Sequence, residues 1–256
     1  MSTAWSLTGR RALITGATKG IGLAVAEELV ALGAAVFVVA RSAPDVAALV
    51  DRLRAAGHDA AGCAADLAEE SGRAILLEAL RAHWDGLDVL VNNVGTNLRK
   101  SSLDYTLADL RSLMAVNLES AWALSQALHP WLSDGGGSIV NVSSISSISI
   151  VATSTAAYAM TKGAMDQMTR FFAVEWAPDG IRVNSVHPWY IRTPLAEQVL
   201  KDPVKRARIE AATPMGRVGE PEEVARAVAF LAMDAAAYIT GTHLIIDGGF
   251  SRLGVR

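Results

Sequence analysis

Two polar side chains, spaced one helical turn apart, offer the clearest chemistry in this sequence. Tyr158 and Lys162 stand at positions i and i+4 of a stretch ending at Trp176 whose pattern predicts a helix, so both lie on one face. A free phenol has a pKa of about 10, which a neighbouring ammonium lowers by stabilising the phenolate. The pair can therefore act as a general acid and base toward an oxygen atom. An amphipathic helix that carries the two residues by chance has the same spacing, so the interpretation depends on what surrounds them.

A glycine-rich turn follows the first apolar run and leads into a predicted helix. It has the sequence Thr-Gly-Ala-Thr-Lys-Gly-Ile-Gly over residues 15–22. Glycines allow a tight turn and let backbone N–H groups approach a phosphate at the helix N-terminus. The spacing between Gly16, Gly20 and Gly22 favours a dinucleotide site, with glycines that serve only close packing as the alternative.

The charges near this turn indicate which dinucleotide it binds. A site that prefers NAD usually carries an acidic residue about 20 residues after the glycines, where it binds the ribose 2′-hydroxyl. Here Arg41 follows the second apolar run, and Lys19 lies inside the glycine turn. A guanidinium can pair with a 2′-phosphate, which a carboxylate would repel. We therefore expect NADP(H) as the cofactor, with two ordinary surface cations as the alternative.

Polar residues also follow other apolar runs. Ser143 and Ser144 come directly after one run, and Asn93 after another. In an open α/β sheet, ligands bind beyond the carboxyl ends of the strands, so these side chains can reach a substrate or cofactor. Asn117 lies inside an apolar helical stretch, where an amide costs stability unless it is hydrogen-bonded. Polar loops and capped turns are the alternative explanation for these residues.

The elements that must position these residues alternate along the chain. Short apolar runs predict buried strands at 12–14, 35–40, 60–65, 87–91, 138–142, 183–186 and 243–246. Amphipathic stretches predict helices at 21–32, 45–56, 69–84, 107–132, 158–176 and 222–233. This alternation predicts an α/β fold, a doubly wound Rossmann-type domain with a parallel seven-stranded sheet and helices on both faces.

No linker rich in Pro, Gly or Ser divides the chain, so we expect residues 1–256 to form one domain. Residues 194–217 carry charges, two prolines and weak periodicity. We expect this stretch to be a mobile excursion that acts as a lid over the substrate.

Composition excludes several other classes of protein. The chain has 256 residues, of which 51% are hydrophobic and 19% charged, so it can bury a large core. A net charge of -3 offers no basic footprint for nucleic acid. The longest apolar run has eleven residues, against the roughly 20 that a membrane-spanning helix needs. With a single cysteine, Cys63, and five scattered histidines, we expect a cytoplasmic protein without a metal site.

Taken together, these motifs resemble the short-chain dehydrogenase/reductase family over nearly the whole chain, from Thr15 to Gly249. The resemblance rests on an ordered set: the glycine turn, Asp66, Asn92-Asn93-x-Gly95, Asn117, Ser144, Tyr158-x-x-x-Lys162 and Asp247-Gly248-Gly249. Three stretches, 92–97, 173–177 and 186–194, look most like the tropinone-reductase-like members of the family.

The resemblance implies a role for each catalytic residue. Tyr158 would protonate the carbonyl oxygen during reduction, and Lys162 would lower the pKa of Tyr158 and hold the nicotinamide ribose. Ser144 would bond the substrate oxygen. Asn117 would hold a water that relays protons to Lys162.

The resemblance also implies a cofactor site and a substrate pocket. NADP(H) would contact Gly16, Thr18, Lys19, Gly20, Ile21, Gly22, Arg41, Asp66, Leu67, Asn93, Gly95, Tyr158, Lys162, Pro188, Ile191 and Thr193. The substrate pocket would be lined by Thr96, Ser144, Ser146, Tyr158, Trp189 and Tyr190.

Two departures from the family pattern leave alternatives open. The gap from Ser144 to Tyr158 is fourteen residues, one more than is common in the family, so Ser143 and Ser146 remain candidates for the substrate serine. Where the family usually has Pro-Gly, the proline is followed by Trp189, whose indole either shapes the substrate pocket or packs against the lid.

We therefore expect an NADP(H)-dependent oxidoreductase that transfers a hydride reversibly between nicotinamide and a ketone or secondary alcohol of a small apolar or cyclic substrate. The alternative enzyme is a 3-oxoacyl-thioester reductase of the fatty-acid type. A non-catalytic NADP-binding sensor is the alternative outside enzymes. The resemblance also implies a homotetramer, or a homodimer, without a nucleic-acid or membrane partner.

Overall fold

The seven apolar runs form one parallel sheet in a computed structural model that describes residues 3–152 and 154–252. The strands are β1 (Arg11–Thr15), β2 (Ala35–Ala40), β3 (Ala60–Ala64), β4 (Val89–Asn92), β5 (Ser138–Val142), β6 (Arg182–Pro188) and β7 (His243–Ile246). Their order across the sheet is β3-β2-β1-β4-β5-β6-β7, and all neighbours are parallel. The predicted doubly wound parallel sheet is confirmed.

This strand order creates a crevice beyond the carboxyl ends of β1 and β4, in the middle of the sheet. The chain runs outward from β1 to β3 and then returns to the other side of β1 as β4. The connections that leave β1 and β4 therefore diverge, and ligands bind at such a point in open α/β sheets. The glycine turn follows β1, and Asn93 follows β4, so both stand at this crevice.

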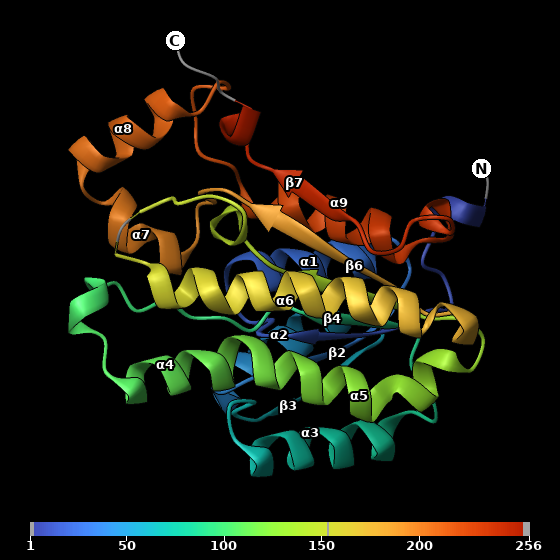
Figure 1. Cartoon of the computed structure of the whole chain (residues 1–256). Coiled ribbons are helices and arrows are strands. Elements are labelled where there is room, and N and C mark those ends of the chain that lie inside the picture. The colour runs from blue at the N-terminus through green and yellow to red at the C-terminus, as the bar shows by residue number, and fades with distance from the viewer. Residues whose placement is uncertain (1–2, 153, 253–256) are drawn as a thin grey trace.

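The α-helices cover both faces of the sheet. They are α1 (Gly20–Ala31), α2 (Ala43–Ala55), α3 (Glu70–His83), α4 (Leu107–Met114), α5 (Ser120–Ser133), α6 (Ala156–Glu175), α7 (Pro194–Leu200), α8 (Pro203–Ala212) and α9 (Pro221–Ala232). In Figure 1, α3, α5 and α6 lie in front of the sheet and α1 lies behind it.

Alternating strand residues build two apolar layers, because successive side chains of a strand point to opposite faces. Ile14 and Val38 belong to a cluster that includes apolar residues of α1, α2 and α9. Leu13 and Phe37 belong to a second cluster with residues of α3, α5 and α6. Full burial of each such side chain contributes about 1.5–3 kcal/mol, so the two layers hold the sheet between the helices.

The helix expected at 107–132 contains a wider turn. Helix α4 continues into a π-helical turn, Ala115–Glu119, which leads directly into α5. Such turns occur often at functional sites. Asn117 lies in this turn and is fully buried.

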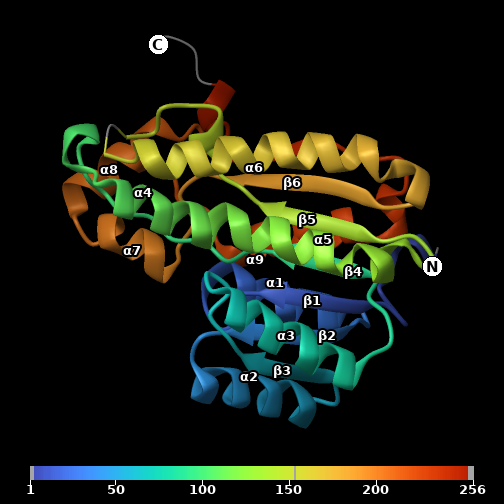
Figure 2. The ribbon, with the colours of Figure 1, turned by 60° about the horizontal axis from the view of Figure 1, so that its bottom comes forward.

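The stretch 194–217 is more regular than the sequence pattern suggested. Thr193 caps α7 by accepting a hydrogen bond from the N–H of Ala196, and Asp202 caps α8 by accepting from the N–H groups of two residues. A proline follows each cap, at the position where proline favours a helix start. Periodicity alone gave no sign of these helices, because their starts are set by the caps, and the lid itself stays a prediction. Figure 2 shows α7 and α8 at the end of the molecule that also holds α4.

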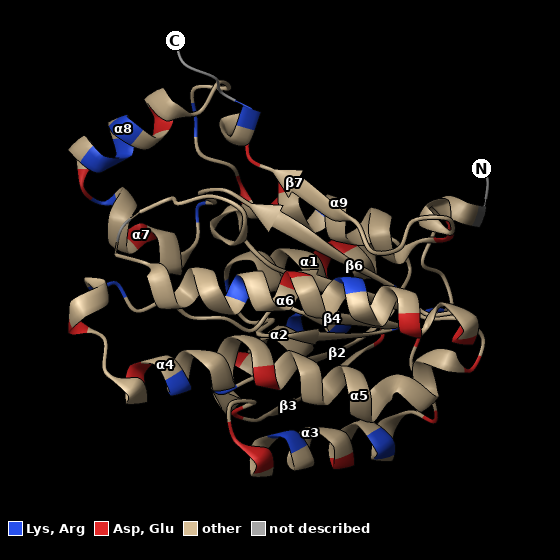
Figure 3. Cartoon of the chain, viewed as in Figure 1, with Lys and Arg blue, Asp and Glu red and all other residues tan. Residues whose placement is uncertain are grey.

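The surface differs between helices. Acidic and basic residues mix on α3 and α8, whereas α5 carries no Lys, Arg, Asp or Glu (Figure 3). Among residues 3–152 and 154–252, no helix is both long and apolar enough to cross a bilayer.

Candidate active site

Helix α6 carries the predicted acid–base pair near its start. Tyr158 and Lys162 lie one turn apart, after the helix begins at Ala156. Lys162 is 3% exposed, and its Nζ donates a hydrogen bond to the carbonyl oxygen of Val142 at 2.7 Å. The ammonium nitrogen lies 5.9 Å from the centre of the Tyr158 ring. The end of β5 therefore holds the lysine beside the tyrosine.

Burial acts on both titratable groups. It lowers the pKa of Lys162 from 10.5 to about 8, against the opposing effect of the Asp166 carboxylate. Burial raises the pKa of Tyr158, whereas a side-chain hydrogen bond with Ser144 and the charge of Arg99 lower it. The predicted lowering of the tyrosine pKa by Lys162 stays a prediction, because here the main chain holds the ammonium.

The three candidate serines differ in their partners. Ser143 is buried, and its Oγ donates to Asp166 Oδ1 at 2.6 Å. The main-chain N–H of Ser146 donates to Ser144 Oγ at 3.1 Å. Of the three, only the side chain of Ser144 acts on Tyr158, whose pKa it lowers. This geometry favours Ser144 as the serine that meets a substrate oxygen.

Asn117 fastens the chain after β4 to the helices. Its Oδ1 accepts from the N–H of Thr96 at 2.8 Å. Its Nδ2 donates to the carbonyl oxygen of Thr96 at 2.9 Å and to Thr161 Oγ1 at 3.0 Å. These bonds satisfy the buried amide and hold Thr96 in place. The predicted water relay to Lys162 stays a prediction.

Asn93 braces the glycine turn. Its Nδ2 donates to the carbonyl oxygens of Thr15 at 2.9 Å and Gly16 at 3.1 Å. A Cβ on Gly22 would lie 2.3 Å from Gly16 O and 2.4 Å from Asn93 Nδ2, so α1 approaches the turn more closely than any side chain permits. Gly16 and Gly20 have φ values of +66° and +56°, which glycine adopts without strain.

The start of α1 fits the pyrophosphate of a dinucleotide. Lys19 precedes the helix, and its side chain does not cap it. The first N–H groups of α1, in residues 20–22, are therefore not bonded by the side chain of the capping residue. The helix dipole adds partial positive charge at this point. From the other side, Thr193 closes on the turn, since a Cβ on Gly20 would lie 3.1 Å from Thr193 Cγ2. Thr193 Oγ1 in turn donates to the carbonyl oxygen of the buried Ile191 at 3.3 Å.

The two predicted cations of the cofactor site are Lys19, inside the glycine turn, and Arg41, directly after β2. Thr18 is half-buried, whereas Lys19 is exposed and its Nζ lies 3.0 Å from Asp45 Oδ2. Arg41 is exposed directly after β2. A 2′-phosphate at this place would meet Arg41 and compete with Asp45 for Lys19.

The remaining cofactor candidates surround the same crevice. Asp66 is exposed, and its Oδ1 accepts from the N–H of Ala68 at 3.1 Å. Leu67, by contrast, is buried, with 3% of its surface exposed. Gly95 is exposed, and a Cβ there would lie 3.6 Å from Lys162 Nζ.

Trp189 packs against the segment that the sequence predicted to be a lid. Strand β6 ends at Pro188, and the indole Nε1 of Trp189 donates to Thr213 Oγ1 at 3.1 Å. The Trp189 ring stacks on Phe250 with centroids 3.6 Å apart and meets Tyr190 edge-on at 4.9 Å. Of the two alternatives for this indole, the contacts favour packing against the end of α8.

Arg99 is a residue that sequence reasoning missed. It lies in the segment after β4, and its Nη1 donates to Gln198 Oε1 of α7 at 2.9 Å. Burial raises the pKa of Tyr158 and of Tyr190, and the charge of Arg99 opposes both rises, so Arg99 stands within electrostatic reach of the site. Its place four residues after Gly95, beyond the carboxyl end of a strand, was the signal that could have found it.

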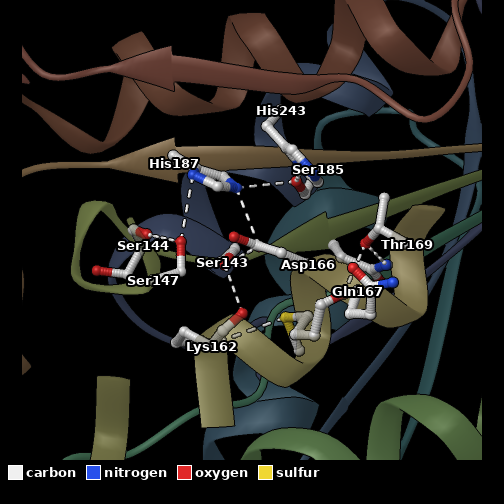
Figure 4. A network of polar contacts seen from close by, with 12 residues as sticks. Ser143, Ser144, Ser147, Lys162, Asp166, Gln167, Thr169, Ser185, His187 and His243 are labelled. Carbon is white, nitrogen blue, oxygen red and sulfur yellow. Dashed lines mark hydrogen bonds and ion pairs between the residues drawn. The ribbon is translucent and has the colours of Figure 1, made fainter. Parts of the chain in front are cut away.

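A second group missed in the sequence is a buried polar network (Figure 4). Asp166 of α6, His187 of β6 and His243 of β7 come together although they are far apart in the chain, and one potential ligand atom of each lies within 4.8 Å of the others. The histidines are scattered along the sequence, but the parallel pairing of β6 with β7 brings two of them together. The signal in the sequence was Asp166, at i+4 from Lys162.

The chain is similar to known proteins over nearly its whole length. The family model described as enoyl-(acyl carrier protein) reductase matches residues 16–251. A tropinone reductase homolog of Arabidopsis thaliana is 48% identical over 252 residues, which cover 96% of this chain and 92% of that protein. Senescence-associated protein 13 of the same plant is 46% identical over 250 residues, or 96% of this chain and 91% of that protein.

Solved structures agree with the fold. Gluconate 5-dehydrogenase from Burkholderia cenocepacia, crystallised with NADP and tartrate, is 33% identical with a TM-score of 0.94 and covers 98% of this chain and 99% of that chain. The RhlG/NADP complex from Pseudomonas aeruginosa is 36% identical with a TM-score of 0.92 and the same coverage. Similarity of this extent shows that the chain belongs to the short-chain dehydrogenase/reductase family, whose members are NAD(P)-dependent oxidoreductases.

Proposed function

We propose that the protein reduces a ketone of a small apolar or cyclic substrate with NADPH and oxidises the matching secondary alcohol with NADP. The observation that carries this proposal is the meeting of Tyr158, Lys162 and Ser144 at the carboxyl end of β5. The names of relatives, which are tropinone reductase homologs, support the substrate class.

The chemistry follows from the positions of these three side chains. When bound, reduced nicotinamide supplies a hydride to the carbonyl carbon. Ser144 donates a hydrogen bond to the carbonyl oxygen, and Tyr158 gives that oxygen its phenolic proton as the new C–H bond forms. The Lys162 ammonium stabilises the phenolate that remains. In oxidation the same phenolate takes the proton of the alcohol.

The cofactor would lie in the crevice between β1 and β4. Residues 16–22 would hold the pyrophosphate, Arg41 the 2′-phosphate, and Thr193 the nicotinamide side. Thr193 packs on Gly20, so the segment after β6 contacts the glycine turn. From this contact we infer that residues 1–256 form a single domain. We also infer that residues 194–217 form a lid over the substrate.

The test is NADPH consumption with a panel of cyclic ketones and an acetoacetyl thioester, followed by absorbance. Tyr158→Phe removes the proton donor, and we expect kcat to fall about 10²- to 10⁴-fold while NADPH still binds. Tyr238→Phe, at a fully exposed ring, is the matched control and keeps the wild-type rate. Unchanged turnover in Tyr158→Phe would refute the assignment of the acid, and activity on the thioester alone would favour the 3-oxoacyl-thioester reductase.

One observation favours a second candidate, an oxidoreductase of hydroxy acids. The positive charge of Arg99 reaches both Tyr158 and Tyr190, and a carboxylate on the substrate would pair with it. A similar structure is a gluconate 5-dehydrogenase crystallised with tartrate. Adding a keto acid such as 5-ketogluconate to the panel tests this, with Arg99→Met expected to raise KM for the acid and not for an uncharged ketone.

We also infer that copies of the chain assemble through α5 and α6, as a homotetramer or homodimer. A groove on this face is lined by Trp122, Gln126, His129, Pro130, Phe172, Glu175 and Trp176. Helix α5 carries no charged residue, which suits burial against a second copy. The lone Cys63 supports a reducing, cytoplasmic location.

A further inference from the structure

A buried polar network lies beside the loop of residues 143–147, which carries Ser144 and is called the serine loop below (Figure 4). Asp166 is 2% exposed and His187 is fully buried. His187 Nε2 lies 3.0 Å from Asp166 Oδ1, so the imidazole and the carboxylate form a close buried pair. Removing one partner of such a buried pair leaves the other as an uncompensated buried polar group, which destabilises the protein.

Asp166 and His187 hold Ser144 from two sides. Ser143, directly before Ser144, donates its hydroxyl proton to Asp166 Oδ1 at 2.6 Å. Ser147 donates to the carbonyl oxygen of Ser144 at 2.7 Å, and its Oγ lies 3.4 Å from His187 Nδ1. The main chain before and after the serine side chain is thus tied to the same pair.

Asp166 also acts on the lysine of the site. It follows Lys162 by one turn of α6, and its negative charge opposes the lowering of the lysine pKa by burial. Tyr158 faces Lys162 from the same helix, while His187 and His243 face Asp166 from β6 and β7. Arg99 adds its charge to Tyr158 from the segment after β4.

The same side chains could also serve as metal ligands, and the hydrogen bonds argue against that use. Ser185 Oγ lies 3.0 Å from His187 Nε2 and 2.6 Å from His243 Nδ1, so a hydroxyl occupies the space between the two imidazoles. Ser185 and His187 are both fully buried. Asp166 accepts from Ser143, and Ser185 contacts both imidazoles, so these buried polar groups have protein partners without a metal ion.

We propose that the Asp166–His187 pair positions the reacting groups of this oxidoreductase: it fixes the loop that presents Ser144, and it places a carboxylate one helical turn from Lys162. This inference rests on the proposed function, in which Ser144 and Lys162 act on the substrate. Asp166 and His187 are positioning residues, because they act through Ser144 and Lys162.

The first experiment follows Lys162 itself and needs no substrate. The chain has five lysines, so with ¹³C-labelled lysine the NMR signal of Lys162 is assigned by its loss in Lys162→Met. Asp166→Asn keeps the size and most hydrogen-bonding capacity of the side chain but removes its charge. We expect Lys162 to lose its proton at a pH lower by on the order of one unit. Asp51→Asn, which removes an exposed carboxylate on α2, leaves the titration unchanged.

The second experiment measures kcat and KM against pH for ketone reduction. In Asp166→Asn we expect the high-pH decline of kcat to move to lower pH, because the ammonium is lost earlier. In His187→Ala we expect kcat to fall about tenfold or more through the loosened serine loop, with partial recovery in His187→Gln, whose amide can still donate to Asp166. KM for NADPH stays within about twofold in all three.

The outcomes separate this inference from the proposed function. A Lys162 titration in Asp166→Asn that coincides with wild type overturns the positioning role, and so does a uniform loss of folded protein without any shift in pH profile. Loss of wild-type turnover on chelation, together with one bound metal per chain, also overturns it. Absence of wild-type turnover on every ketone refutes the proposed function, while the NMR titration still decides the inference.

Discussion

At the residue scale, many polar side chains around the crevice hold the main chain in place. Asn93 uses its amide on the carbonyl oxygens of the glycine turn, and Asn117 uses its amide on Thr96. The Ser144 side chain, in contrast, acts on Tyr158, whose pKa it lowers against the effect of burial. The residues expected to meet ligands are thus supported by amides that have no spare donor.

A first prediction at this scale concerns cofactor choice. Arg41→Asp places a carboxylate where a 2′-phosphate would bind, and we expect the preference for NADPH over NADH to fall about 10- to 100-fold. Kd values for both cofactors, measured by fluorescence, provide the comparison. Arg81→Asp, at an exposed position on α3, is the control and keeps the wild-type ratio. The same ratio in Arg41→Asp and wild type would count against the role of Arg41.

A second prediction concerns the pH dependence of stability. The folded pKa of Lys162, about 8, lies below its unfolded value of 10.5, so burying the ammonium costs stability at all pH values below 8. This cost falls as the pH rises from 8 to 10.5, because the folded state releases its proton first.

Lys162→Met removes that cost, and we expect it to be more stable than wild type by about 1–2 kcal/mol at pH 7, after allowing for the donor lost by Val142 O. This gain in stability should shrink toward pH 10. The variant should lose activity, because it lacks the Lys162 ammonium. Denaturant unfolding at both pH values measures the difference. A gap between the two proteins that stays constant with pH would contradict the assignment.

At the scale of elements, the end of a strand and the start of the next helix act as one unit. The turn after β1 works because Gly22 lets α1 approach Gly16 and Asn93. The π-helical turn between α4 and α5 places Asn117 against the segment after β4. Thr193 caps α7 and touches Gly20, which links the last part of the site to the first.

The third prediction tests the close approach of α1. Gly22→Ala puts a methyl group 2.3 Å from Gly16 O, so the turn must shift, and we expect a loss of about 1–3 kcal/mol in stability and at least tenfold weaker NADPH binding. Gly163→Ala on α6 has open space, with its nearest neighbour 3.9 Å away, and should gain up to about 1 kcal/mol. Thermal unfolding and NADPH titration distinguish them. Wild-type binding in Gly22→Ala would show that the turn tolerates the shift.

At the scale of the whole molecule, one face stands out for its apolar side chains. On α5 and α6, Trp122 is 47% exposed, Phe171 62% and Val174 79%. Large exposed apolar groups that cluster on neighbouring helices mark contact surfaces. Figure 3 shows that α5 lacks charges, unlike α3 and α8.

The fourth prediction is that the wild-type protein is an oligomer that this face holds together. Phe171→Glu places a charge in the interface, and we expect it to lower the assembly by at least one step, to dimer or monomer, in analytical ultracentrifugation. Ile75→Glu alters another exposed apolar residue, 52% exposed and located on α3, and should leave the mass unchanged. A monomeric wild-type protein would refute the assembly itself.

The sequence predicted elements better than it predicted contacts. The strands at 35–40, 138–142 and 243–246 have the predicted bounds, and the other strands and most helices differ at their ends by a few residues. Parallel strands are buried on both faces, so each of them appears in the sequence as a continuous apolar run. The caps of α7 and α8 were also written in the sequence, as Thr193-Pro194 and Asp202-Pro203, but in a segment where periodicity alone gave no signal.

The sequence by itself determined the fold class and the family, and it predicted the composition of the site, since each depends on residue types in fixed order along the chain. Only the tertiary structure decided which side chains meet. It favoured Ser144 over Ser143, placed Trp189 against the end of α8, and brought Asp166, His187 and His243 together. These contacts join elements that are far apart in the chain, and their distances follow from the register of parallel strands and the packing of helices on them, which no local pattern records.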